Sequence, residues 1–82
     1  MPNDQYITLD IGTPAGRFVQ EFPKTTKVGD VITAAIEAMN LDPNEQFDLV
    51  HEGAVLDRNR PVVSYHFGDG TRLELVATGS GV

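Results

Sequence analysis

The 82-residue chain contains no cysteine. This absence excludes disulfide bonds, zinc sites built on thiolates and a cysteine nucleophile. Small secreted domains often depend on disulfides, so their absence favours a reducing compartment, and we expect a cytoplasmic protein. A chain of this length corresponds to one domain with a small core, which is poorly suited to a deep active-site cleft.

Long apolar runs and basic residues are also lacking. No run approaches the roughly 18 apolar residues that span a bilayer, and residues 1–5 lack the basic and apolar stretches of a signal peptide. Six Lys and Arg residues stand against twelve Asp and Glu residues, which gives a net charge of -6. This charge repels nucleic acid and anionic lipid, so we expect neither as a partner. The acidic excess serves either solubility or attraction to a basic partner surface.

The first half of the chain shows two hydrophobic periods. Residues 6–11 alternate apolar and polar side chains, which predicts a half-buried strand. Residues 12–16 are rich in Gly and Pro and predict a turn, so residues 17–22 form the second strand of a hairpin. Spacing of three and four residues then predicts an amphipathic helix, whose apolar stripe comprises Val28, Val31, Ile32, Ala35, Ile36 and Met39.

The predicted helix covers residues 27–40. Thr26 precedes it and is predicted to be its N-cap, because a threonine hydroxyl can accept a hydrogen bond from a free backbone N–H group. Pro43 fits a stop shortly after the helix, because a proline ring disfavours helical geometry at the preceding residue.

The second half returns to a period of two. Alternation over residues 47–51 and 72–78 predicts two further strands, each with its leucines facing inward. A turn at Gly53 precedes a short stretch, residues 54–57, that can add a brief strand. Residues 62–67 are ambiguous and can include a helical turn.

This order of elements predicts an α+β fold. One helix would pack across a mixed sheet of four to five strands, because that arrangement buries both apolar faces. Residues 1–78 would form the domain. Residues 79–82 have nothing to pack against and would form a flexible tail.

The same order, with these residues, resembles the ubiquitin-like β-grasp family. Residues 47–76 align with ubiquitin without a gap, and the looser resemblance extends over residues 6–82. No single motif carries the resemblance, which rests on a joint pattern. Its landmarks are Leu49-Val50-His51-Glu52-Gly53, Leu56-Asp57, Val62, Tyr65, Phe67 and Thr71-Arg72-Leu73-Glu74-Leu75-Val76.

The resemblance implies a structural role for Tyr65. In ubiquitin the matching hydroxyl turns inward onto a backbone N–H group of the preceding loop. Here that N–H group would lie near Asp57, and a buried hydroxyl needs such a partner.

The resemblance also implies an outward apolar patch on the sheet that binds proteins. Val50 and Val76 fall on two of the patch positions of ubiquitin. A third contribution would come from the first turn, from Thr13, Pro14 or Ala15. The alternative is that these valines are scattered surface residues without a function.

The residues around this patch differ in charge from those of ubiquitin. Ubiquitin has basic residues and a histidine where this chain has Asp48, Glu74 and Thr78. We therefore expect an acidic rim that does not bind the partners of ubiquitin.

The chain ends in Gly79-Ser80-Gly81-Val82. Ubiquitin and its relatives are activated at the carboxylate of a C-terminal glycine. Their tail must thread a narrow channel in which a side chain would clash, and this favours glycine. The resemblance implies that trimming of Val82 would expose Gly81 for conjugation, with Gly79 and Ser80 in the flexible approach. The alternative is a chemically idle tail. The absence of a terminal diglycine disfavours a sulfur carrier.

Nothing in the sequence points to catalysis. The histidines, His51 and His66, do not form a set with Ser64 and Asp69 that sequence spacing alone could support, because catalytic sets are defined by geometry. His66 is predicted to be a surface residue. We expect no enzyme activity, no cofactor and no metal site.

Two hypotheses follow from the resemblance. The first is a bacterial or archaeal ubiquitin-like modifier, a monomer whose partners are an activating enzyme, a conjugating enzyme, a trimming peptidase and target proteins. The second is a non-conjugated ubiquitin-like adaptor that binds partner proteins through the face of its sheet.

Overall fold

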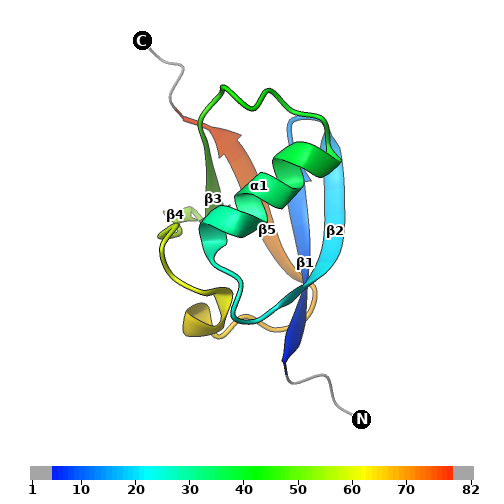
Figure 1. The fold of residues 1–82 in the computed structure, drawn as a ribbon. Coiled ribbons are helices and arrows are strands. Elements are labelled where there is room, and N and C mark those ends of the chain that lie inside the picture. Colours follow the sequence, from blue (N-terminus) through cyan, green and yellow to red (C-terminus); the bar gives the residue numbers. More distant parts are fainter. Residues whose placement is uncertain (1–4, 79–82) are drawn as a thin grey trace.

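The computed structural model describes residues 5–78 and shows five strands and one α-helix in this part of the chain (Figure 1). The elements follow the predicted order and add a short 3₁₀ helix in the ambiguous stretch. In chain order they are β1 Tyr6–Thr13, β2 Gly16–Pro23, α1 Val28–Ala38, β3 Phe47–His51, β4 Ala54–Val55, η1 Val62–Tyr65 and β5 Thr71–Ala77.

The strands form a mixed sheet in the order β2-β1-β5-β3-β4. The central pair, β1 and β5, is parallel, and the other neighbours are antiparallel. Helix α1 lies across one face of this sheet (Figure 1). The predicted α+β, ubiquitin-like β-grasp fold is therefore confirmed, with five strands.

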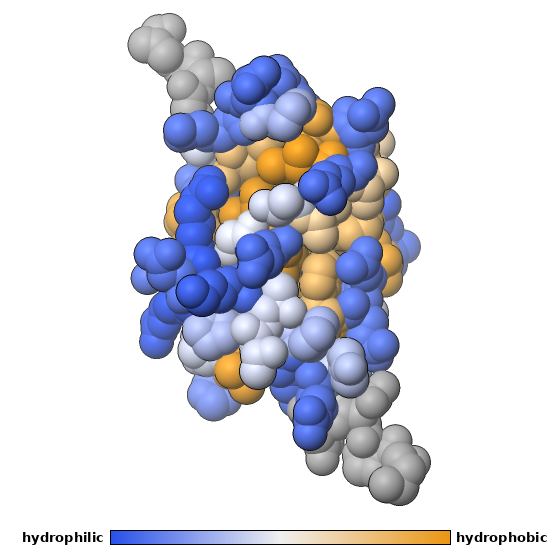
Figure 2. Space-filling model, viewed as in Figure 1, coloured by the Kyte–Doolittle hydropathy of each residue, from blue (hydrophilic) through white to orange (hydrophobic). Residues whose placement is uncertain are grey.

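The core lies between α1 and the sheet. The inward residues of the strands meet the apolar stripe of the helix there, as their periodicities predict. Leu9, Ile11, Leu49, Leu73, Val28, Val31 and Val62 are the largest side chains among those that are fully buried. The later stripe residues, Ile36 and Met39, are only partly buried against the core. The space-filling view from the helix side accordingly shows apolar surface in the region of α1, bordered by hydrophilic residues (Figure 2).

The predicted N-cap of α1 was wrong. The cap position is Lys27, and no side chain caps the helix. Instead, the N–H groups of Val28 and Gly29 donate to the carbonyl oxygens of Arg60 and Arg58 at 2.9 and 3.0 Å. A loop distant in sequence therefore satisfies the N–H groups that the first turn leaves free, so no capping hydroxyl is needed.

The helix also ends earlier than Pro43 suggests. Asn40 has a positive φ of 56°, and the N–H group of Leu41 donates to the carbonyl of Ile36 at 2.9 Å. A left-handed residue just past the last turn is a common way to end a helix, and asparagine tolerates that conformation better than most residues. Within residues 5–78, no helix has the length and apolarity needed to cross a membrane.

Candidate protein-binding face

The predicted patch residues Val50 and Val76 and the predicted rim residues Asp48 and Glu74 lie together on the solvent face of the sheet, opposite α1. The antiparallel register of β3 and β5 places Asp48 opposite Val76 and Val50 opposite Glu74. The residues between them, Leu49 and its neighbours on β5, point into the core. The predicted inward and outward faces of both strands are therefore confirmed, whereas protein binding by this face stays a prediction.

Val55 joins these residues and was missed from the sequence. It lies on the two-residue strand β4, directly opposite Val50, and 62% of its surface is exposed. The sequence feature that could have placed Val55 is the Glu52-Gly53 pair, which predicts a two-residue hairpin turn. A two-residue hairpin turn fixes the register, so the turn alone would have placed Val55 beside Val50.

The turn itself has the geometry that suits such a hairpin. Glu52 and Gly53 both have positive φ, at 51° and 84°. Positive φ at both central positions defines a type I′ turn, whose twist matches that of the flanking strands.

Val55, Val50 and Val76 lie on one face across the adjacent strands β4, β3 and β5, and are here called the valine row. Val55 and Val50 are a direct cross-strand pair, and Val50 and Val76 are diagonal neighbours. Side chains of a direct cross-strand pair lie close enough to contact one another, and diagonal neighbours lie on the same face of the sheet. Val76 is 38% exposed and Val50 is partly exposed, so the row presents aliphatic side chains to solvent.

The charges around the row are more balanced than the expected acidic rim. An Arg58 nitrogen lies 3.4 Å from the Asp48 carboxylate, and an Arg72 nitrogen lies 3.3 Å from the Glu74 carboxylate. Arg58 also donates to the carbonyl of Phe47. Each rim carboxylate thus has an arginine beside it, and the rim offers both signs of charge to a partner.

An open hollow of about 500 Å³ borders the row. It lies between the β3–β4 turn and the start of β5. Its lining residues are Val50, His51, Glu52, Gly53, Thr71, Arg72 and Glu74. A partner side chain could enter here beside the valines.

Further along the same face, Asp10 and Arg17 form a two-point ion pair. Arg17 Nε donates to Oδ1 of Asp10 at 2.9 Å, and Arg17 Nη2 donates to Oδ2 at 2.7 Å. These hydrogen bonds lower the pKa of Asp10, with a smaller contribution from the charge of Arg72. The β1–β2 side of the face therefore carries a paired charge, although Val19, directly opposite Asp10, is 51% exposed beside it.

On this face, the backbone of Gly12 lies next to the side-chain carboxylate of Glu74. The two residues are partners in the parallel β1–β5 register, and a Cβ atom on Gly12 would lie 2.8 Å from Oε1 of Glu74. The absence of a side chain at Gly12 lets the Glu74 carboxylate lie across β1.

The first turn is tighter than its Gly and Pro content suggested. The strands continue to Thr13 and from Gly16, which leaves only Pro14 and Ala15 between them. The Thr13 hydroxyl donates to the carbonyl of Gly16 at 2.6 Å and accepts from the N–H group of Ala15 at 3.1 Å. The parallel register of β1 and β5 puts this turn at the same end of the sheet as Val76, so its predicted contribution is compatible with the fold.

The other residues considered in the sequence are those of the C-terminal tail and those weighed for catalysis or metal binding. Gly79, Ser80, Gly81 and Val82 lie outside the described residues, which end at Thr78. His66 is exposed, as predicted, and the Ser64 hydroxyl donates to the carbonyl of Pro61 at 2.9 Å. Among residues 5–78, no group of three or more His, Asp or Glu side chains could hold a metal ion.

Comparison with known families gives one match that covers most of the chain. The TUG ubiquitin-like domain family matches residues 11–75. The chain belongs to this family. The match includes β3, β4 and nearly all of β5, so the valine row lies on the family's domain, with only Val76 just beyond the matched range.

Solved structures share the fold of this TUG ubiquitin-like domain. One, from work on molecular mimicry of SUMO that promotes DNA repair, has a TM-score of 0.80 at 25% identity, with 88% of this chain and 91% of that chain covered. Caldiarchaeum subterraneum ubiquitin has a TM-score of 0.77 at 21% identity, with 94% and 99% covered. The ubiquitin-like domain of Plasmodium falciparum Dsk2 has a TM-score of 0.76 at 18% identity, with 89% and 99% covered. No curated protein matches the chain by sequence.

Proposed function

We propose that the chain is a non-conjugated ubiquitin-like adaptor domain that binds a protein partner through the valine row. The observation that carries this proposal is that Val55, Val50 and Val76 share one exposed face on three adjacent strands. Ubiquitin-like domains in general interact with proteins, and proteins of this fold are generally not enzymes. The matching family is one of ubiquitin-like domains, which favours the adaptor over the modifier.

The physical argument rests on rigidity and exposed apolar area. Covering an exposed valine side chain contributes on the order of 1 kcal/mol, so three valines on one face supply a useful share of a moderate affinity. The three side chains sit on strands of one sheet and have few rotamers, so little conformational entropy is lost on binding. The arginine and carboxylate pairs at the edge add orientation more than affinity.

The test is site-specific photo-crosslinking followed by a direct binding measurement. A photoreactive amino acid at position 55 should capture a defined protein from an extract of the native host, and the same amino acid at position 33 should not. Thr33 is a matched control because its side chain has the shape of valine and is exposed, but it lies on α1, on the other side of the sheet. The captured protein is then purified and its affinity is measured by calorimetry.

The combined change Val55→Asp and Val76→Asp should weaken that affinity at least about tenfold, because it places charges in an apolar contact. Thr33→Asp should leave the affinity unchanged. Equal weakening by both variants, or by neither, would contradict binding through the valine row.

We also propose a second candidate, in which the protein is a modifier. The glycine-containing stretch 79–82 begins directly after the last described residue, Thr78, so removal of Val82 would leave Gly81 terminal a few residues from the sheet. An activating enzyme, a conjugating enzyme and a trimming peptidase would then act on it.

Intact mass measurement in the native host tests the modifier. A form lacking Val82, together with higher-mass adducts that disappear in Gly81→Ala but persist in Gly79→Ala, would support conjugation. A single full-length mass, with the partner of the valine row still bound after deletion of residues 79–82, would contradict the modifier hypothesis and leave only the adaptor hypothesis.

A further inference from the structure

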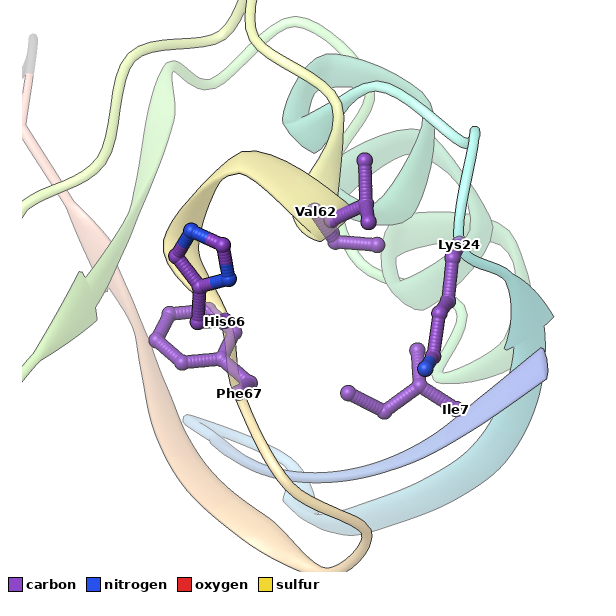
Figure 3. Close-up of a pocket in the computed structure, with 6 residues that line it drawn as sticks. Ile7, Lys24, Val62, His66 and Phe67 are labelled. Carbon is purple, nitrogen blue, oxygen red and sulfur yellow. The ribbon is translucent and has the colours of Figure 1, made fainter. Parts of the chain in front are cut away.

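A second concave surface lies apart from the valine row, at the end of the domain where β1 begins (Figure 3). The start of β1, the segment after β2 and the η1 region surround it. It has a volume of about 230 Å³. Its lining residues are Ile7, Lys24, Val62, Val63, His66 and Phe67, and it is called here the Lys24 hollow.

The floor of the Lys24 hollow is apolar and its edge is polar. Ile7 and Val62 are 2% and 0% exposed, so they belong to the core and reach the hollow from below. Lys24 and His66 come from opposite sides of the opening, and the Lys24 nitrogen lies near Ile7 (Figure 3). A ligand group that enters would meet aliphatic surface below and nitrogen atoms at the side.

Backbone hydrogen bonds hold the walls in place. The N–H group of Lys24 donates to the carbonyl of Gln5 at 2.8 Å, and the N–H group of Val63 donates to the carbonyl of Lys24 at 3.0 Å. The N–H group of Val62 donates to the carbonyl of Thr26 at 2.9 Å. The hollow is therefore preformed, and its occupant need not order the surrounding chain.

The charge of Lys24 has no counterpart within residues 5–78. Arg17, Arg58 and Arg72 each lie beside a carboxylate, and Arg60 lies over the Tyr65 ring. Lys24 forms no ion pair in this part of the chain, although the protein carries twice as many acidic as basic residues. Lys27 also forms none but is exposed, whereas Lys24 is half-buried and lines the apolar hollow.

The size of the hollow limits its occupant. Pockets for drug-sized ligands have volumes of about 300–1,000 Å³, so this hollow suits a single side chain rather than a cofactor. Apolar anchors that fill small pockets, with a polar group at the edge, are typical of strong contact points in protein interfaces. The charge of Lys24 selects an anionic neighbour for that anchor.

We propose that the Lys24 hollow binds an aliphatic side chain of a protein partner together with an adjacent carboxylate, which pairs with Lys24. The aliphatic group covers Ile7, Val62 and Phe67. The carboxylate lies between Lys24 and His66, whose ring nitrogen can donate a hydrogen bond. This contact is separate from the valine row and does not depend on it.

The test uses N-acetyl-leucine as the probe, since it carries an isobutyl side chain beside a carboxylate and its acetyl group removes the positive charge of the amine. Titration into the ¹⁵N-labelled full chain should shift the amide signals of the residues lining the hollow and give a saturable curve in the millimolar range. N-acetyl-leucinamide lacks the charge and acetate lacks the side chain, so both should bind several-fold more weakly.

Two substitutions assign the contact to Lys24. Lys24→Met keeps most of the aliphatic chain and removes the charge, so it should weaken N-acetyl-leucine binding roughly threefold to fivefold, as expected for a partly exposed ion pair. Lys27→Met is the matched control and should leave binding unchanged. The amide spectrum of each variant outside the hollow shows that the fold is intact.

Three results would each overturn the proposal. These are the absence of shifts at the hollow, equal binding of N-acetyl-leucinamide, and equal weakening by the two lysine variants. Shifts confined to the valine row would likewise show that the probe recognises exposed apolar surface in general.

Discussion

The backbone N–H group of Asp57 donates a hydrogen bond of 2.8 Å to the hydroxyl of Tyr65, eight residues further along the chain. This is the contact that the resemblance to ubiquitin implied, and it is confirmed. Tyr65 also stacks on Phe67, with ring centroids 5.4 Å apart, and the Arg60 guanidinium lies over its ring. The tyrosine thereby connects the loop after β4 to η1.

Replacing Tyr65 by phenylalanine should destabilise the domain by about 1 kcal/mol, because the N–H group of Asp57 loses its partner while the ring packing stays. Urea unfolding followed by circular dichroism measures the change. Tyr6→Phe is the control, since Tyr6 is 43% exposed and its hydroxyl makes no hydrogen bond within residues 5–78. Equal losses in the two variants would mean that the hydrogen bond contributes nothing specific.

The type I′ turn of the β3–β4 hairpin predicts opposite effects at its two central residues. Gly53→Ala should cost about 1 kcal/mol, because φ is 84° there and a Cβ atom meets no neighbour, so the cost comes from the backbone alone. Glu52→Asn should stabilise by a few tenths of a kcal/mol, because asparagine suits the left-handed conformation better than glutamate. Thermal unfolding measures both, and a stable Gly53→Ala variant would argue against this turn.

Leu49 and Val50 are neighbours on β3 that face opposite sides of the sheet. Leu49→Ala should cost roughly 2–5 kcal/mol, because Leu49 is fully buried and its truncation leaves a cavity. Val50→Ala should cost less than about 1 kcal/mol, because Val50 lies on the solvent face. Chemical denaturation of the two variants tests the face assignment on which the valine row depends, and a reversed order would refute it.

The ion pair of Asp10 and Arg17 predicts a pH-dependent contribution to stability. Because the hydrogen bonds from Arg17 lower the pKa of Asp10 in the folded state, the contribution is present above the unfolded pKa, about 3.9, and is lost as pH falls through the folded value. Arg17→Gln should therefore destabilise at neutral pH and match the wild type in strong acid. Urea midpoints at several pH values measure this.

Lys27→Gln serves as the control for the ion pair. It removes a cation that has no carboxylate beside it within residues 5–78, so its effect should vary little with pH. If the difference between Arg17→Gln and the wild type stayed constant down to strong acid, the ion pair would not be the source of the acid sensitivity.

Local pattern was enough to place the strands and the helix and to assign inward and outward faces. Alternation of side chains fixes the face of a strand wherever one side is buried, which is why Leu49 and Val50 were assigned correctly. The same logic placed Val50 and Val76 on one surface. Helix ends were less predictable, because the N-terminal partners of α1 are the carbonyl groups of Arg58 and Arg60.

Charge and shape at the surface depended on contacts across the chain. The pairing of Asp48 with Arg58 and of Glu74 with Arg72 changes the character of the rim, and sequence distance alone does not reveal which charges meet. The Lys24 hollow likewise combines residues from β1, the segment after β2 and the η1 region, which no local pattern connects.

The sequence by itself determined the elements, the buried faces and the fold family, because hydrophobic periodicity and turn residues act locally and leave one compact arrangement that buries both apolar stripes. Only the tertiary structure decided that arginines balance the rim and that Lys24 stands beside an apolar hollow. These features arise where segments distant in the chain meet, and such meetings are fixed by the packing of the whole core.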